Sequence, residues 1–241
     1  MFFLIPWATY LFIYLAAALL PALFLMRYIY RKDSWEPEPV PLLVSLALSG
    51  VLAGFLSGVL EGVFGRILSF LPINKDSHLY TILTAFLVVA AVEEGMKAYL
   101  LYRRTWEDAN FNYSFDAVVY SAFVSLGFAA IENLIYVFTY GLSVALPRAA
   151  LAIPGHFGFS VVFGYFYGRA RERADLGFFS ASRANLLAGY VLAVFLHGFY
   201  DSCAMLGTST SLSCFLLFII ILYLVIFKVV EKAAREDKPL Y

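Results

Sequence analysis

The chain has 241 residues, of which 62% are hydrophobic and only 14% are charged. A soluble domain is typically about 45–50% apolar and about 25% charged, so this composition, with a mean hydropathy of +0.81, excludes a soluble globular protein and predicts a polytopic membrane protein. The formal net charge is zero and the sequence has no basic stripe, so no nucleic-acid partner is expected.

Seven apolar segments are long enough to cross a bilayer as helices. They are residues 3–26, 41–64, 79–102, 115–140, 145–168, 185–206 and 212–230. Their apolar runs are continuous rather than alternating, which argues against transmembrane strands. Because no Gly/Ser-rich or Pro-rich linker separates two cores, the sequence predicts an all-α membrane helix bundle, with one integral domain over residues 1–241.

The first segment is predicted to stay in the membrane rather than to be cleaved as a signal peptide. Its apolar run, Phe2 to Met26, is too long for the hydrophobic region of a signal peptide, and no basic residue precedes it. Arg27, Arg31 and Lys32 follow it, as in a stop-transfer sequence.

Basic residues gather on one predicted side of the membrane. Thirteen of the seventeen Lys and Arg residues follow the first, third or fifth helix or lie in the C-terminal tail, whereas Arg66, Lys75 and Arg148 fall on the opposite side and Lys97 lies within a helix. The positive-inside rule then predicts an external N-terminus and a cytoplasmic C-terminus. We therefore expect a multi-pass protein of the cell membrane, in contact with the lipid bilayer.

The second segment carries glycines at a spacing of four residues, which places them on one helix face. They are Gly50, Gly54, Gly58 and Gly62. Such a face either lets a neighbouring helix approach closely or forms a homo-oligomer interface.

Two cysteines, Cys203 and Cys214, flank a short loop. The sequence leaves open whether they form a disulfide or are two isolated, buried small hydrophobic residues, which is the commoner case.

Several ionisable side chains lie inside the apolar runs. At the centre of a membrane helix, an acidic or basic residue costs roughly 2.5–3.5 kcal/mol on insertion scales. A chain that carries several must let them face one another or a water-filled cavity. These residues are Glu93, Glu94, Lys97, Glu132, His156, His197 and Asp201.

In the segment 79–102, Glu93 and Glu94 point about 100° apart around the helix, so one can face a cavity and the other a neighbouring helix. Lys97 lies within reach of either. The lysine would neutralise one carboxylate and lower the cost of burial, which leaves the other as a candidate general base. The sequence does not decide between them, and the cluster could instead be a helix end near the cytoplasmic surface, because Arg103 follows closely.

The following three segments contribute the other candidates. Glu132 has no basic partner at helical spacing on its own helix, so it is protonated, bound to a metal or paired with another helix. His156 follows a Pro-Gly pair that predicts a kink, and it is either a hydrogen-bonded core residue or a functional one. His197 and Asp201 share one helix face, either as two site residues or with the aspartate orienting the imidazole.

These residues are predicted to converge at one level of the membrane. Counted from the predicted helix ends, Glu93, His156 and His197 lie near the middle of the bilayer, with Glu132 slightly closer to the outside. Two histidines, a carboxylate and a water form a catalytic zinc site, and a separate carboxylate can deprotonate that water. The third histidine, His78, is predicted in an outside loop and is assigned no role.

The motifs occur in a specific order: paired glutamates with a downstream lysine, a Phe and a Glu separated by three residues, a histidine in the next helix, and a final His-x-x-x-Asp. Here they are Glu93, Glu94 and Lys97; Phe128 and Glu132, followed by Asn133; His156; and His197 and Asp201. Residues 33–39, Asp-Ser-Trp-Glu-Pro-Glu-Pro, add a further signature. Over roughly residues 30–205, the chain resembles the PrsW family of intramembrane proteases, distant relatives of the CAAX prenyl proteases.

The resemblance implies a protease that cuts membrane-anchored protein substrates, with extracytoplasmic cleavage of an anti-sigma factor as the best-known role. By analogy with CAAX-type relatives, Glu93 would activate water, and His197 and Asp201 would flank the carbonyl oxygen. This chain has Glu132 where those relatives have histidine, and Asp201 where they have asparagine. An ionised Asp201 would repel an oxyanion unless it were paired or metal-bound, so this departure favours a metal.

The resulting hypothesis is an intramembrane zinc metallopeptidase. In it, Glu93 or Glu94 is the general base, Glu132, His156 and His197 are metal ligands, Asp201 is a ligand or an orienting residue, and Lys97 neutralises the glutamate pair. Two other classes remain: a proton-coupled transporter, because buried Glu, His and Asp also form relays, and a non-catalytic membrane scaffold. Inverted repeats would favour a transporter, and the sequence has no convincing internal repeat.

Overall fold

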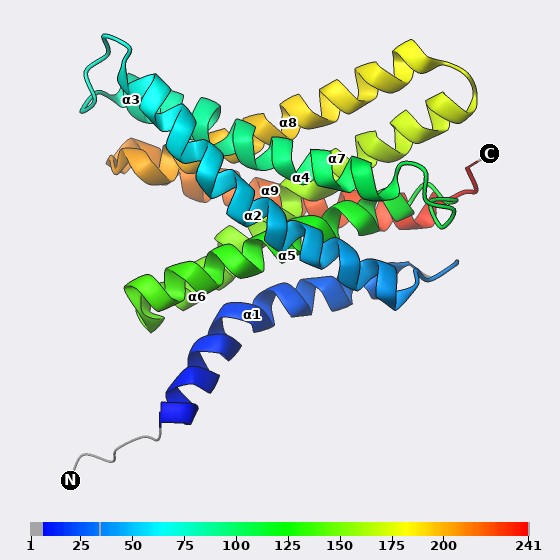
Figure 1. Ribbon diagram of the computed structural model, residues 1–241, viewed down its shortest axis with the longest axis horizontal. Helices are drawn as coiled ribbons and strands as arrows, with labels where there is room; N and C mark the ends of the chain where they lie inside the picture. The colour runs from blue at the N-terminus through cyan, green and yellow to red at the C-terminus, as the bar shows by residue number, and fades with distance from the viewer. Residues whose placement is uncertain (1–6, 34, 241) are drawn as a thin grey trace.

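The computed structural model describes residues 7–33 and 35–240, which are mostly helical with no β-strand among them. The elements are α1 (Trp7–Lys32), α2 (Val40–Ser69), α3 (His78–Leu83), the π-helix η1 (Thr84–Ala90), α4 (Ala91–Thr105), α5 (Asp116–Tyr140), the 3-10 helix η2 (Leu142–Val144), α6 (Ala145–Ala150), α7 (Ala152–Asp175), α8 (Phe179–Leu206) and α9 (Ser209–Arg235). Figure 1 shows them as a bundle of long helices.

The described residues contain seven helical stretches long and apolar enough to cross a membrane, which confirms the predicted all-α membrane bundle. Two of these stretches are built from several elements: α3, η1 and α4 form residues 78–105, and η2, α6 and α7 form residues 142–175. Most helices run beyond their predicted apolar cores, as α2 does by five residues to Ser69. Residues 3–6 of the first predicted segment lie outside the described residues.

Helix α5 lies at the centre of the bundle, against α1, α2 and α7. Its residues 116–129 are buried without interruption. Two serines tie it to α7: Ser121 Oγ donates to the carbonyl of Ser160, and Ser125 Oγ donates to the carbonyl of His156, both at 2.9 Å. These bonds satisfy hydroxyl groups in an apolar interior and fix the backbone of α7 at the histidine.

The glycine face of α2 is half packed and half open. A Cβ at Gly50 would lie 1.9 Å from the Val124 carbonyl oxygen, and one at Gly54 would lie 2.8 Å from Ile131 Cγ2, so both are covered by α5. A Cβ at Gly58 or Gly62 would meet nothing within 4 Å. The predicted packing ridge is therefore present in the first half of the face, while the homo-oligomer interface stays a prediction.

The predicted kink near His156 lies slightly earlier than the Pro-Gly pair. The chain departs from helical geometry at Leu151, between α6 and α7, with φ −121° and ψ −56°. Pro154 is the third residue of α7, where a missing backbone N–H costs no helical hydrogen bond. The proline therefore helps to begin the helix that carries the histidine.

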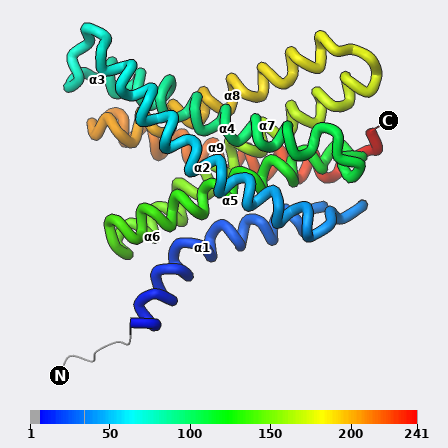
Figure 2. Tube along the Cα trace, in the orientation of Figure 1, coloured from blue at the N-terminus to red at the C-terminus, as the bar shows by residue number. Residues whose placement is uncertain are grey.

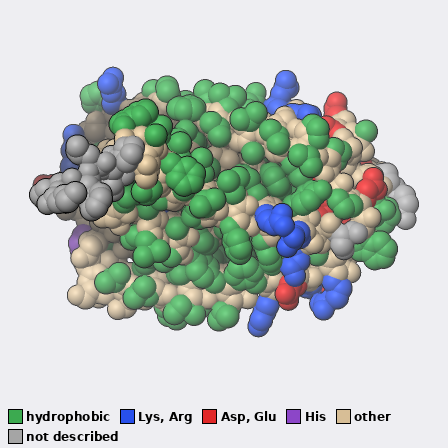
Figure 3. Space-filling view, turned by 90° about the horizontal axis from the view of Figure 1, so that it is seen from below, with side chains coloured by type: hydrophobic (Ala, Val, Ile, Leu, Met, Phe, Trp, Pro, Cys, Tyr) green, Lys and Arg blue, Asp and Glu red, His purple; other side chains and the backbone are tan. Residues whose placement is uncertain are grey.

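The surface matches a membrane protein. In Figure 3, hydrophobic side chains cover most of one face, and charged side chains gather mainly towards one end. The C-terminus lies at the same end of the bundle as the α7–α8 connection (Figure 2). That agrees with the predicted topology, but which end is cytoplasmic stays a prediction.

Three smaller expectations also have outcomes. Cys203 and Cys214 are free thiols; Cys203 is buried as expected, whereas Cys214 is exposed. His78 does not lie in a loop but is the first residue of α3, because Ser77 caps that helix by accepting a hydrogen bond from the Tyr80 backbone.

Candidate active site

Three helices bring four ionisable side chains to one buried point. Glu93 and Glu94 come from α4, His156 from α7 and His197 from α8. One oxygen or nitrogen from each lies within 4.8 Å of those from the other three, and all four residues are buried. The structure thus places these sequence-predicted candidates together, buried between helices.

Lys97 is the positive charge at the centre of this cluster. Its Nζ donates to Glu94 Oε1 at 2.7 Å and to Glu93 Oε2 at 3.3 Å, as the helical spacing predicts. The same ammonium lies 3.2 Å from His156 Nδ1 and 4.0 Å from the centroid of the Phe128 ring. One buried cation therefore contacts both glutamates, one histidine and an aromatic face, which lowers the cost of burying the carboxylates.

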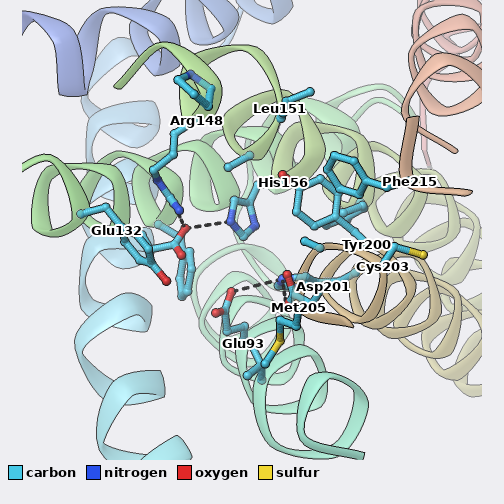
Figure 4. Close-up of a pocket in the computed structure, with 18 of the residues that line it drawn as sticks. Glu93, Glu132, Arg148, Leu151, His156, Tyr200, Asp201, Cys203, Met205 and Phe215 are labelled. Carbon is cyan, nitrogen blue, oxygen red and sulfur yellow. Dashed lines mark hydrogen bonds and ion pairs between the residues drawn. The ribbon is translucent and has the colours of Figure 1, made fainter. Parts of the chain in front are cut away.

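The two glutamates have different surroundings. Glu94 Oε1 accepts from His197 Nδ1 at 2.8 Å as well as from Lys97, so its carboxylate is held between helices. Glu93 lines the main cavity (Figure 4). The rotation of α4 thus answers the question that the sequence left open: Glu93 faces the cavity and Glu94 faces neighbouring side chains.

His197 is oriented by this contact. A carboxylate accepts but does not donate, so Nδ1 carries the proton and Nε2 faces the other acidic groups. Nε2 lies 3.3 Å from Asp201 Oδ2 and 3.9 Å from Glu93 Oε2. The imidazole also stacks on the Phe159 ring, with centroids 5.0 Å apart. The ring plane of His197 and the direction of its Nε2 are therefore fixed.

His156 bridges Lys97 and Glu132. An ammonium can only donate, so Nδ1 of His156 accepts from Lys97, and Nε2–H donates to Glu132 Oε2 at 3.0 Å. The two imidazole rings lie edge to face, with centroids 5.1 Å apart. The two histidines thus stand side by side, each with a carboxylate near its Nε2.

Glu132 has a basic partner on a different element, which is one of the three alternatives that the sequence left open. Arg148 of α6 places Nη2 2.7 Å from Glu132 Oε2, and its Nε donates to Asn133 Oδ1 at 3.0 Å. The Asn133 amide in turn donates to the Ala18 carbonyl of α1 at 2.8 Å. Arg148 is a site residue that the sequence interpretation missed; the signal was a lone arginine on the side of the membrane that carries few basic residues.

These groups surround a cavity of about 880 Å³. Residues of α2, η1, α4, α5, α6, α7, α8 and α9 line it. Among them, Glu93, Glu132, Arg148, His156 and Asp201 border it (Figure 4). Glu61 and Tyr200 also line it, and neither was a candidate from the sequence. A mostly apolar cavity with a few convergent polar groups is the usual form of a substrate site.

Comparison with known proteins gives a consistent result. The profile of a family described as "PrsW family intramembrane metalloprotease" matches residues 38–230. A protein named Protease PrsW from Geobacillus kaustophilus is 31% identical over 199 residues, which cover 79% of each chain. Its namesake from Clostridioides difficile is 28% identical over 228 residues, which cover 93% of this chain and 92% of that relative.

Protease PrsW from Bacillus subtilis is 29% identical over 199 residues, which cover 79% of this chain and 82% of the relative. No solved structure matches the chain. The match to the family profile spans the second to seventh membrane helices and every residue of the buried cluster.

Proposed function

Because the chain belongs to the PrsW family of intramembrane proteases, we propose that it hydrolyses a peptide bond of a membrane-anchored protein by a zinc-dependent mechanism with Glu93 as general base. The observation that carries this proposal is that Glu93, which lines the cavity, lies buried beside His156 and His197. It deepens the coarser conclusion, that the chain is an intramembrane protease, by naming the metal and the base.

The side chains present fit a zinc ion. Imidazole nitrogens and carboxylate oxygens are zinc ligands at about 2.0–2.2 Å, which places neighbouring ligands of a tetrahedral site about 3.3–3.6 Å apart. The pair His156 Nε2–Glu132 Oε2, at 3.0 Å, and the pair His197 Nε2–Asp201 Oδ2, at 3.3 Å, are close to that separation. We therefore propose Glu132, His156 and His197 as ligands, with Asp201 as a further ligand or an orienting residue. One position then stays open for water, and a bound zinc ion would supply a Lewis acid that polarises the scissile carbonyl and acidifies water.

The two histidines are not equally prepared for this role. His197 donates its Nδ1 proton to Glu94, the arrangement in which a carboxylate sets the tautomer and leaves Nε2 for a ligand. In His156, the proton must move from Nε2 to Nδ1, and Lys97 must direct its ammonium to the two glutamates alone. Lysine has three donors on a flexible stem, so the change at Lys97 needs only side-chain rotation, whereas the change at His156 is a transfer of its ring proton.

Glu93 is the base that the geometry favours over Glu94. Its carboxylate lines the cavity, and its weaker contact with Lys97, at 3.3 Å against 2.7 Å for Glu94, leaves it freer to accept a proton from water. Glu94 is occupied by Lys97 and His197 and acts as a positioning residue. The proposed division of labour is thus one glutamate for proton transfer and one for orientation.

The proposed substrate is a membrane-anchored protein, in line with the anti-sigma-factor role implied by the resemblance. A cavity bordered by apolar helices within the membrane suits a peptide segment that leaves the bilayer. Arg148 and Tyr200 both line this cavity and could donate hydrogen bonds to the carbonyls of such a segment.

The test is cleavage in proteoliposomes that contain the purified full chain and isotope-labelled single-span membrane proteins. New peptide termini are identified by mass spectrometry. Loss of a general base lowers rates by about 10²–10⁴-fold, so Glu93→Gln should abolish detectable cleavage. The matched control is Glu107→Gln, an exposed residue in the loop after α4, which should cleave at the wild-type rate. Full cleavage by a folded Glu93→Gln variant would remove the assignment of the base.

A further inference from the structure

A second group of buried carboxylates lies away from the active site. Asp33 follows α1, Glu38 precedes α2 and Asp116 begins α5, and the three residues are only 4%, 4% and 1% exposed. One oxygen from each lies within 4.8 Å of those from the other two. Asp116 precedes Glu132 by sixteen residues on the same helix, roughly 24 Å at the α-helical rise, so the two clusters are separate sites.

Each of these carboxylates has an oxygen that is buried and has no hydrogen-bond partner: Asp33 Oδ2, Glu38 Oε2 and Asp116 Oδ1. The orientation of Asp116 is fixed, because its other oxygen accepts from the backbone N–H groups of Asn112, at 3.0 Å, and Tyr113, at 2.6 Å. Buried polar atoms in proteins are nearly always paired, so three orphaned oxygens at one point indicate an absent partner.

That partner is not a basic side chain. Across residues 7–33 and 35–240, no ion pair involves any of the three carboxylates. Ionised carboxylates in this position therefore need a positive charge, or else they must take up protons.

We propose that Asp33, Glu38 and Asp116 bind a divalent cation of the hard class, Mg²⁺ or Ca²⁺, as a structural site distinct from the protease centre. The three side chains offer only oxygen ligands, which suit these ions. They include no imidazole and no thiolate, the ligands that zinc favours. The ion ties the connection between α1 and α2 to the first turn of α5, the central helix that also carries Glu132. Its role is to hold the outer helices to the helix that presents the active site.

Equilibrium binding of radioactive Ca²⁺ to the full chain in detergent, after divalent cations are removed with a chelator, tests this proposal, with Mg²⁺ added as competitor. The expected result is one saturable site per chain that is lost in Asp116→Asn and Glu38→Gln. Two matched controls should keep it: Glu107→Gln, an exposed acidic residue just before α5, and His197→Ala in the protease centre. Absence of saturable Ca²⁺ or Mg²⁺ binding to the wild-type chain up to about 10 mM, tenfold beyond the weakest protein calcium sites, overturns the proposal.

Thermal unfolding gives a second readout that a fold defect cannot imitate. The Tm of the wild-type chain should rise with added cation, whereas that of Asp116→Asn should not change, and the variant should be at least as stable as the cation-free wild type. If Asp116→Asn does not fold, Asp33→Asn in the α1–α2 connection replaces it. A folded variant that binds the cation with wild-type affinity contradicts the proposal, as does a wild-type Tm unaffected by cation.

Discussion

In the protease centre, buried carboxylates share their space with Lys97, Arg148 and two histidines, whereas Asp33, Glu38 and Asp116 have no basic neighbour among the described residues. Both clusters bury acidic groups, and α5 carries a residue of each, Asp116 in its first turn and Glu132 farther along. The first is neutralised from within the chain and borders a large cavity. The second leaves three oxygens unpaired.

This difference distinguishes the protease centre, whose groups take part in a reaction, from the second cluster, whose proposed role is structural. A reacting carboxylate needs water and a neighbouring charge that can exchange partners, as Lys97 can among Glu93, Glu94 and His156. A structural cluster needs a fixed counter-charge and no access for water. Removal of the positive charge should therefore damage the first cluster, whereas removal of a negative charge should relieve the second.

The largest effect on stability is expected from Lys97→Met. Removal of one partner from a buried ion pair costs about 3–5 kcal/mol, since Glu93 and Glu94 would lose their cation. The free energy of unfolding, measured by denaturation in mixed detergent micelles, should fall by that amount, whereas Asp116→Asn in chelator should cause no loss. The double variant Lys97→Met/Glu94→Gln should recover part of the stability. Equal stability of Lys97→Met and wild type would contradict the account.

Glu94→Gln should have an intermediate effect, because Glu94 acts through His197. Loss of a carboxylate that orients a metal-ligating histidine typically costs 10–100-fold in metal affinity or activity. Zinc affinity measured by competition with a chromogenic chelator, together with the cleavage rate, should fall within that range. A zinc affinity unchanged from wild type would mean that the contact between Glu94 and His197 is only structural.

The smallest effects on stability are expected where α2 packs against α5, the helix that carries a residue of each cluster. Gly50→Ala should lower the free energy of unfolding by about 1–3 kcal/mol, as overpacking usually does, because the new Cβ would meet the backbone of α5. Gly58→Ala, with open space at that position, should change it by less than about 0.5 kcal/mol. Light scattering of both variants checks the predicted glycine-mediated oligomer, which Gly58→Ala would weaken.

Hydrophobicity and motif spacing were enough to predict the membrane helices and the convergence of Glu93, His156 and His197. Long apolar runs have few alternatives in a bilayer, and charged groups inside them must meet. The sequence could not choose between Glu93 and Glu94, because that choice depends on the rotation of α4 about its axis. Helix α4 begins immediately after the π-helix at residues 84–90, which was not predicted from the sequence.

Contacts between side chains on distant segments also could not be predicted from the sequence. Arg148 reaches Glu132 because α6 packs against α5, a contact between elements that the sequence does not predict. Asp116 was not a candidate, since one aspartate at the start of a helix is the usual sign of a favourable helix end. Asp116 forms a cluster with Asp33 and Glu38, which lie about eighty positions earlier in the chain.

The most direct test of the central claim is the zinc content of the purified full chain, measured beside His197→Ala and the double variant His156→Ala/His197→Ala. The account predicts about one zinc ion per wild-type chain and its loss from both variants while the helical circular dichroism signal is retained. A folded wild-type chain that cleaves its substrate without bound zinc, in the presence of a chelator, would contradict the metal-dependent mechanism and the proposed ligands.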